Sequence, residues 1–273
     1  MSQELRFLKE HQAYISRVDE GLKVLMAKHA AHPLYDAMTY SLQGGKRLRP
    51  LVLLLVNEAL GAGPEEPIPA TSAIELLHTV SLIHDDVIDE ERVRRNMLPY
   101  YQKYGVDSAL LSADFVLGII LEVASGYREG AVGSELSRAA IEMSAGEEME
   151  RKIVRGTDNV SWKNYIEVLE LKTASLFRAS AAVGAALSAQ KSFKSKIDEF
   201  GMKLGMAYQL RDDLADIDKP GELINILELA GEDRIKKVAN AADEYGAAAL
   251  AILRSLPSSA SLEKLEKLVA EYF

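Results

Sequence analysis

Helical periodicity runs through almost the whole chain of 273 residues and limits what it can fold into. The helix-favouring residues Ala, Leu, Glu and Lys are abundant, and apolar residues recur at intervals of three and four. No segment shows the alternation of a half-buried strand, because Val and Ile also fall at helical spacing. No long linker divides the chain. The sequence therefore predicts one all-α domain over residues 1–273, a single large helical bundle.

Turn and cap residues divide this pattern into segments. Pro50 suits the first turn of a helix, and the glycines and proline from Gly61 to Pro64 end that helix. The helices that we expect cover residues 3–30, 34–42, 50–60, 69–90, 97–104, 107–127, 133–153, 161–188, 194–217, 221–230, 232–254 and 259–272.

Composition excludes several function classes. Hydrophobic residues make up 48% of the chain, which supports a folded core, and the net charge of −9 argues against a nucleic-acid partner. Without cysteine, the chain has no disulfide, thiolate metal site or thiol nucleophile. The charged first ten residues do not resemble a signal peptide, and the apolar runs fall short of the roughly 20 residues of a membrane span. We expect a cytoplasmic protein with no membrane span.

An acidic pentad, Asp-Asp-x-x-Asp, occurs twice: the first acidic pentad is residues 85–89 and the second is residues 212–216. On a helix, the first and last Asp of each pentad share a face, where like charges repel. Carboxylates beside apolar residues resist burial unless a cation joins them. One pentad alone is often a solvated acidic face, but two copies in apolar helices favour a single Mg²⁺ site. The candidate metal ligands are Asp85, Asp86, Asp89, Asp212, Asp213 and Asp216.

A basic stretch, Gly-Gly-Lys-Arg-Leu-Arg-Pro, occupies residues 44–50. Its two glycines let the backbone approach a ligand closely, and Lys46, Arg47 and Arg49 then precede the start of a helix. Lysine and arginine in this setting suit a phosphate group, although exposed basic turns are common.

Other candidate contacts are scattered along the chain. Arg94 and Arg95 follow the first acidic pentad, where they either compensate its charge or face one phosphate group each. Lys172, inside an apolar helix, is either an anion contact or a surface lysine that lays its stem on apolar neighbours. His78 and His84 lie on the same expected helix as the first pentad, and His78 is the better candidate for a ligand contact.

Together these stretches resemble the trans-isoprenyl diphosphate synthases, the polyprenyl synthetase family, and within it the geranylgeranyl diphosphate synthases. The resemblance keeps the family's order and spacing from about residue 35 to 230. It implies a bundle of long helices around a deep central cavity, usually a homodimer. It also implies a Mg²⁺-dependent prenyltransferase that joins isopentenyl diphosphate head to tail to an allylic diphosphate and releases pyrophosphate. The segments that carry it are residues 44–50, 75–89, 94–95, 172–173 and 208–213.

The same resemblance implies a role for each candidate residue. The six pentad aspartates would hold Mg²⁺ ions that grip the allylic diphosphate. Further contacts to that diphosphate would come from Arg94, Lys172 and Lys219. The isopentenyl diphosphate pocket would be formed by Lys46, Arg47, Arg49, His78 and Arg95. Thr173 and Gln209 would line the reacting centre. The residues assigned to catalysis are Asp85, Asp86, Lys172, Thr173, Gln209 and Asp212.

In this family the residues beneath the first pentad set the product length. Ser81 lies about one helical turn before Asp85, and Val80 occupies the neighbouring face. Because neither is aromatic, this turn should not block a growing chain. We therefore expect geranylgeranyl diphosphate or a somewhat longer product, with Phe115 as a candidate for a deeper floor.

Two other functions remain open from the sequence. The stretch after Asp216 is shorter and poorer in lysine than in the family, which would fit a non-catalytic or weakly active subunit of a heteromeric prenyl diphosphate synthase. A terpene cyclase or head-to-head synthase would share acidic clusters but generally lacks the basic stretch of residues 44–50. An assay of the purified protein alone, with isopentenyl diphosphate and allylic primers, separates the first alternative from an active enzyme.

Overall fold

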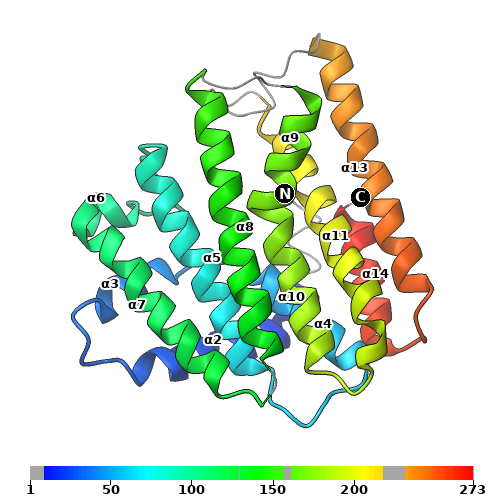
Figure 1. Ribbon diagram of the computed structural model, residues 1–273, viewed down its shortest axis with the longest axis horizontal. Helices are drawn as coiled ribbons and strands as arrows, with labels where there is room; N and C mark the ends of the chain where they lie inside the picture. The colour runs from blue at the N-terminus through cyan, green and yellow to red at the C-terminus, as the bar shows by residue number, and fades with distance from the viewer. Residues whose placement is uncertain (1–8, 129, 157–160, 218–230, 273) are drawn as a thin grey trace.

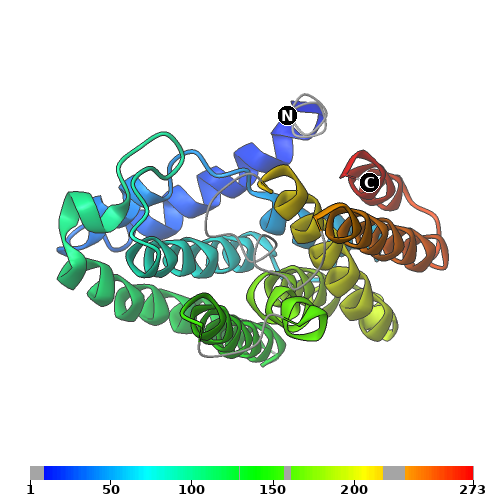
Figure 2. The same ribbon diagram turned by 90° about the horizontal axis from the view of Figure 1, so that it is seen from above.

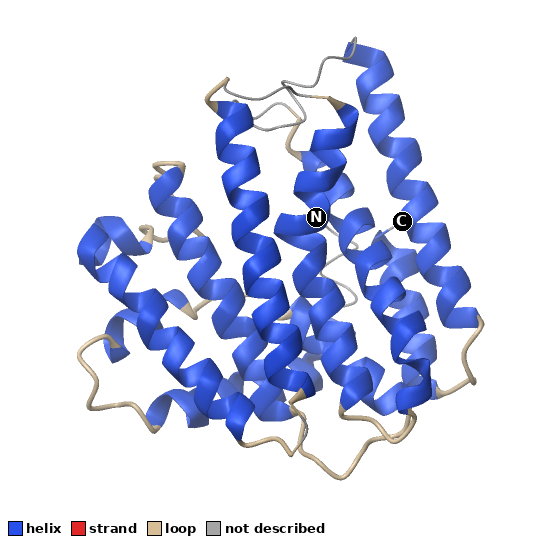
Figure 3. Cartoon of the chain, viewed as in Figure 1, coloured by secondary structure: helices blue, strands red, loops and turns tan. Residues whose placement is uncertain are grey.

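The computed structural model describes residues 9–128, 130–156, 161–217 and 231–272. These ranges hold helices and two isolated bridges but no strand, which confirms the predicted all-α class (Figure 3). The elements in chain order are α2 (Gln12–Ala27), α3 (Tyr35–Ser41), α4 (Leu48–Ala59), α5 (Ile68–Ile88), α6 (Tyr100–Tyr104), α7 (Val106–Ser125), α8 (Ala131–Val154), α9 (Trp162–Leu169), η1 (Glu170–Ala174), α10 (Ser175–Ala186), η2 (Lys191–Phe193), α11 (Lys194–Ala215), α13 (Gly231–Arg254) and α14 (Ala260–Tyr272).

Two long helices differ from the prediction. Of the helix expected over residues 3–30, the described part is interrupted at His11 and ends at Ala27. The helix expected over residues 161–188 is split into α9 and α10 by η1, a five-residue π-helix that contains Lys172 and Thr173. Short π-helical turns are rare and occur often at functional sites. The helix expected over residues 221–230 lies outside the described residues, as does Lys219.

The bundle is organised around α10. This helix contacts α4, α8 and α11, and all 12 of its residues are buried (Figure 1). Most of them are Ala, Ser or Gly, so neighbouring helices approach closely, and a helix without a polar face belongs in the interior. Seen from above, α2 and α7 lie on opposite sides of α5, and both contact it (Figure 2).

Two glycines bring neighbouring helices against η1. A Cβ atom at Gly146 on α8 would lie 2.5 Å from the backbone nitrogen of Lys172. A Cβ atom at Gly205 on α11 would lie 2.6 Å from the Cα atom of Ala174. Both distances are too short for any other residue without a backbone shift. Glycine at these positions therefore lets α8 and α11 close on η1 from two sides.

A buried ion pair joins α2, α4 and α5 beneath the basic stretch. Arg47 is the N-cap of α4 with φ of +56°, and its side chain is 7% exposed. Its guanidinium donates hydrogen bonds to Glu75 Oε1 at 2.6 Å and Asp19 Oδ1 at 2.7 Å, and also to the carbonyl of Leu42. Burial alone would lower the pKa of Arg47, but these carboxylates raise it above its usual value. Arg47 is thus engaged inside the fold.

We expect Arg47→Met to destabilise the protein, because it leaves Glu75 buried without a partner. The free energy of unfolding, measured by urea denaturation, should fall by about 3–5 kcal/mol. The matched control is Arg138→Met, whose exposed pair with Glu142 should contribute about 0.5 kcal/mol or less. Equal, small decreases in the free energy of unfolding in both variants would contradict a structural role for Arg47.

Candidate active site

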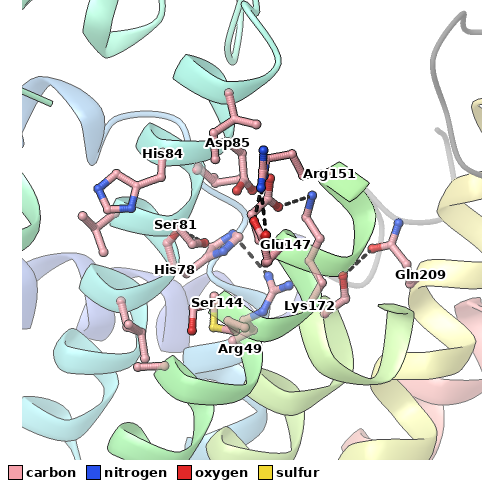
Figure 4. Close-up of a pocket in the computed structure, with 18 of the residues that line it drawn as sticks. Arg49, His78, Ser81, His84, Asp85, Ser144, Glu147, Arg151, Lys172 and Gln209 are labelled. Atoms are coloured by element: carbon pink, nitrogen blue, oxygen red, sulfur yellow. Dashed lines mark hydrogen bonds and ion pairs between the residues drawn. The ribbon is translucent and has the colours of Figure 1, made fainter. Parts of the chain in front are cut away.

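A cavity of about 650 Å³, the main cavity, lies between α5, α8, η1 and α11, and Arg49 from α4 reaches into it (Figure 4). Its volume is typical of small-molecule sites. Its deeper wall is largely apolar and includes Leu77, Val80 and Met143. The bundle therefore surrounds a cavity, as the sequence predicted.

The first acidic pentad lies at the carboxyl end of α5, but its three aspartates differ in environment. Asp85 lines the main cavity. Asp86 is 2% exposed and accepts a hydrogen bond from Arg94 Nε at 2.7 Å. Asp89 is the C-cap of α5 and does not line the cavity. Only Asp85 of the three thus points its carboxylate at the cavity.

The second acidic pentad lies at the carboxyl end of α11 and repeats this division. Asp212 lines the main cavity, and Asp216 is the C-cap of the helix. Asp213 is 5% exposed and accepts hydrogen bonds from the hydroxyl of Tyr165 at 2.5 Å and from Gln209 Nε2 at 2.7 Å. Asp213 therefore supports Gln209, while Asp212 reaches the cavity.

The electrostatics at the mouth of the main cavity favour a bound cation. Both pentads end helices, where the partial negative charge of the helix terminus adds to that of the carboxylates. Burial raises the pKa of Asp85 to about 7, against the attraction of Lys172 and together with the charge of Glu147 and a hydrogen bond to it. Burial also raises the pKa of Asp89. A cation between these groups would stabilise their charged forms.

The donor set fits Mg²⁺ bound jointly with a ligand. Within the described ranges, no three acidic or histidine side chains stand close enough to hold a metal alone. Mg²⁺ commonly binds through one or two carboxylates and completes its shell with water and substrate phosphates. Asp85 and Asp212, offered by two helices around one cavity, meet this requirement. The other four candidate ligands remain predictions.

Lys172 is the cation at the centre of the site. It forms ion pairs with Glu147 at 2.7 Å and with Glu150, both on α8. Burial alone would lower the pKa of Lys172, but the carboxylates of Glu150, Asp85 and Glu147 raise it well above its usual value. The ammonium group therefore stays charged beside the cavity that Asp85 also lines.

The residue after Lys172 begins a hydrogen-bonded chain. The hydroxyl of Thr173 donates to Gln209 Oε1 at 2.9 Å, and Gln209 Nε2 donates in turn to Asp213. Both Thr173 and Gln209 line the main cavity. The chain fixes the Gln209 amide and links η1 to the second acidic pentad.

A second cavity of about 270 Å³ lies beside the basic stretch. Arg49 and His78 line both cavities and thus mark their junction. Burial, followed by the charge of Arg49, lowers the pKa of His78 well below its usual value. The neutral imidazole can then accept a hydrogen bond at Nε2 from Arg49 Nη1, 3.2 Å away. The structure brings together the six basic residues Lys46, Arg47, Arg49, His78, Arg94 and Arg95.

A tight turn fixes the two arginines after the first pentad. The backbones of Arg94 and Met97 exchange two hydrogen bonds of 2.9 Å, and both Arg95 and Asn96 between them have positive φ. Arg95 donates to the carbonyls of Ser41 at 3.3 Å and Gln43 at 3.2 Å. The turn thus directs Arg94 toward Asp86 and Arg95 toward the backbone that precedes the basic stretch. Arg49 keeps a buried Nε with no hydrogen-bond partner among the described residues.

Sequence reasoning missed one wall of the site and misplaced one residue. The face of α8 that lines the main cavity was not predicted, although its spacing of three and four was visible; it comprises Ala140, Met143, Ser144, Glu147, Glu148 and Arg151. Phe115, expected as a cavity floor, is not among the lining residues. Its ring instead stacks on His32, with centroids 3.9 Å apart. Val80 and Ser81 do line the cavity.

Comparison with known proteins places the chain in a family. The family model described as polyprenyl synthetase matches residues 31–226. A geranylfarnesyl diphosphate synthase of Methanosarcina mazei is 34% identical over 197 residues, which cover 72% of this chain and 62% of that protein. A geranylgeranyl diphosphate synthase of the same organism is 32% identical over 216 residues, covering 77% and 66%. The chain thus spans less than two thirds of each of these relatives.

Solved structures agree with this match. A geranylgeranyl pyrophosphate synthetase from Pyrococcus horikoshii superposes with a TM-score of 0.84 at 25% identity, over 99% of this chain and 98% of that one. One from Geoglobus acetivorans gives a TM-score of 0.82 at 27% identity, also over 99% and 98%. On the family match and these relatives, this chain belongs to the polyprenyl synthetase family.

Proposed function

We propose that the protein is a Mg²⁺-dependent trans-prenyltransferase that condenses isopentenyl diphosphate head to tail with an allylic diphosphate. The observation that carries the proposal is the junction of two unlike cavities. One is acidic at its mouth and apolar below, and the other is basic. They meet at Arg49 and His78. Two diphosphate esters bound there would bring their reacting carbons together.

The main cavity suits the allylic substrate. Bound Mg²⁺ would neutralise the charge that develops on the departing pyrophosphate, an effect worth several kcal/mol. Lys172 adds a fixed positive charge beside Asp85, and Arg94 is positioned nearby by Asp86. The apolar side chains deeper in the cavity exclude water from the allylic cation formed when the carbon–oxygen bond breaks.

Side chains at the junction orient the reacting groups. Thr173 and Gln209 offer a hydroxyl and an amide held in place by Asp213, so their dipoles need no rearrangement during the reaction. In the second cavity, Lys46, Arg49 and Arg95 would hold the isopentenyl diphosphate. Arg47 also lines this cavity, but its guanidinium is already engaged by Glu75 and Asp19. The released pyrophosphate would accept the final proton.

The activity is tested with purified protein, isopentenyl diphosphate and each allylic primer in turn. We expect prenyl diphosphate products with Mg²⁺ and none after EDTA. Asp85→Asn and Asp212→Asn should each lower kcat at least about 100-fold, because each removes a carboxylate that would bind Mg²⁺. The control Asp107→Asn, at an exposed position in the first turn of α7, should not change kcat.

Two outcomes would contradict this assignment. Wild-type protein that is inactive with every primer would favour the alternative of a non-catalytic subunit of a heteromeric synthase. Activity that survives EDTA would overturn the role of Mg²⁺.

The shape of the main cavity supports a product of geranylgeranyl length or longer. Ser81 lines the cavity on α5 beneath Asp85, and its hydroxyl donates to the carbonyl of His78 at 2.9 Å. We expect Ser81→Phe to shorten the main product, because its ring would fill the space taken by the growing chain. Ser81→Ala, which adds no bulk, is the control. Unchanged product length in Ser81→Phe, measured by chromatography, would refute this placement.

An exposed apolar face suits a second copy of the chain. Leu110, Leu117 and Leu121 on α7 are 54–61% exposed at a spacing of seven and four, and Ile141 on α8 is 66% exposed. Among the described residues, α7 is also the one helix long and apolar enough to cross a membrane, with 33% of it buried. Because one such helix is weak support for a span, we propose a cytoplasmic homodimer that covers this face.

Charged substitutions on this face should separate the copies. We expect Leu117→Glu combined with Leu121→Glu to shift the protein from dimer to monomer in light scattering after size-exclusion chromatography. The control Val24→Glu, at a position 55% exposed on α2, should leave the mass unchanged. A monomeric wild-type protein, or a double variant that stays dimeric, would rule out this interface.

A further inference from the structure

Arg151 lies at the mouth of the main cavity and has no role in the assignments above. It belongs to the face of α8 that lines this cavity, with Ser144 and Glu147 preceding it at intervals of three and four. Ala140, at the deeper end of the same face, is 11 positions earlier, or about 16 Å along the helix axis. The face therefore runs from an apolar interior to a basic side chain at the mouth.

The position of Arg151 suits contact with an anion in the cavity. Arg151 lines the same space as Asp85 and Lys172, and Figure 4 shows it extending toward the part of the site where those two side chains lie. Its planar fork of donors matches the oxygens of a phosphate group, which it can bind in a bidentate manner. A diphosphate held at the mouth would come within reach of this fork.

The present partner of Arg151 is easily exchanged. Its guanidinium donates two hydrogen bonds of 2.7 Å to Glu148, and both side chains are partly exposed, at 32% and 46%. Ion pairs at the surface contribute little to stability. Lys152 Nζ lies 3.6 Å from Glu148 in the same surface cluster, and water reaches the Glu148 carboxylate because that side chain is partly exposed. Releasing Arg151 would therefore leave no buried charge alone.

The other cations of this region are less available. Arg94 is tied to Asp86, whose side chain is 3% exposed, and Lys172 is held between Glu147 and Glu150. The contact of Arg151 with Glu148, in contrast, lies at the surface and involves no buried carboxylate.

We propose that Arg151 is a further substrate-binding residue for the allylic diphosphate. When the diphosphate occupies the mouth of the main cavity, the guanidinium leaves Glu148 for the diphosphate oxygens, and Glu148 stays in contact with water. The identity of the ester rests on the proposed function. The contact itself requires only a diphosphate in the main cavity.

The first test compares Arg151→Gln with Lys152→Gln in steady-state assays. A lost hydrogen bond between charged groups should raise the KM for the allylic substrate at least about tenfold in Arg151→Gln. The KM for isopentenyl diphosphate should stay unchanged. The increase in allylic KM should be equal for dimethylallyl, geranyl and farnesyl diphosphate, because Arg151 would contact the diphosphate group and not the hydrocarbon chain. Lys152→Gln, which alters the same surface cluster without lining the cavity, should leave every KM within about twofold.

A second test does not depend on turnover. Binding of inorganic pyrophosphate with Mg²⁺, measured by isothermal titration calorimetry, should weaken at least about tenfold in Arg151→Gln and recover in part in Arg151→Lys. If pyrophosphate binding weakens in this way while wild-type protein makes no prenyl product, the proposed function fails and the role of Arg151 stands. Circular dichroism checks that each variant is folded.

Three results would overturn the proposal. One is an equal change in allylic KM in Arg151→Gln and Lys152→Gln. Another is an increase in allylic KM in Arg151→Gln that depends on the length of the primer, which would indicate a changed cavity shape. The third is unchanged pyrophosphate affinity in folded Arg151→Gln.

Discussion

Burial of acidic side chains at the mouth of the main cavity is the constraint on which the site depends. Asp85 and Asp212 line one cavity with Glu147, and the first two stand at or near helix ends whose own partial charge is negative. Lys172 offsets part of this charge, yet burial still raises the pKa of Asp85 to about 7. The fold thus favours bound cations at the point where we propose that a diphosphate binds.

The scaffold makes this arrangement possible by holding its helices unusually close. Gly146 and Gly205 let α8 and α11 press against η1, and the fully buried α10 anchors the same segment below. The π-helical turn interrupts what would otherwise be one continuous helix and presents Lys172 and Thr173 to the cavity. Groups fixed in this way need little reorganisation, which is how electrostatic stabilisation becomes effective in catalysis.

Helical class, the pentads and the basic residues could be predicted, because each leaves a local pattern in the sequence. The pattern does not say which carboxylate faces the cavity. Asp86 and Asp213 turn inward because Arg94 and Tyr165, partners from other segments, hold them there. Likewise, Glu75 lies 28 positions from Arg47 in the sequence and holds its guanidinium in a buried ion pair. The sequence alone indicated only that Arg47 would bind isopentenyl diphosphate. The wall formed by α8 has the charge pattern of an ordinary solvated helix, so only packing distinguishes it.

The central claim, that the two pentads share one metal-bridged diphosphate site, is tested most directly by electron paramagnetic resonance of Mn²⁺ as a stand-in for Mg²⁺. We predict tight Mn²⁺ binding that requires inorganic pyrophosphate, because the described side chains form no complete metal cage. Asp85→Asn and Asp212→Asn should each weaken it, whereas Asp107→Asn should not. Mn²⁺ binding that needs no pyrophosphate, or that survives Asp212→Asn unchanged, would contradict a shared site.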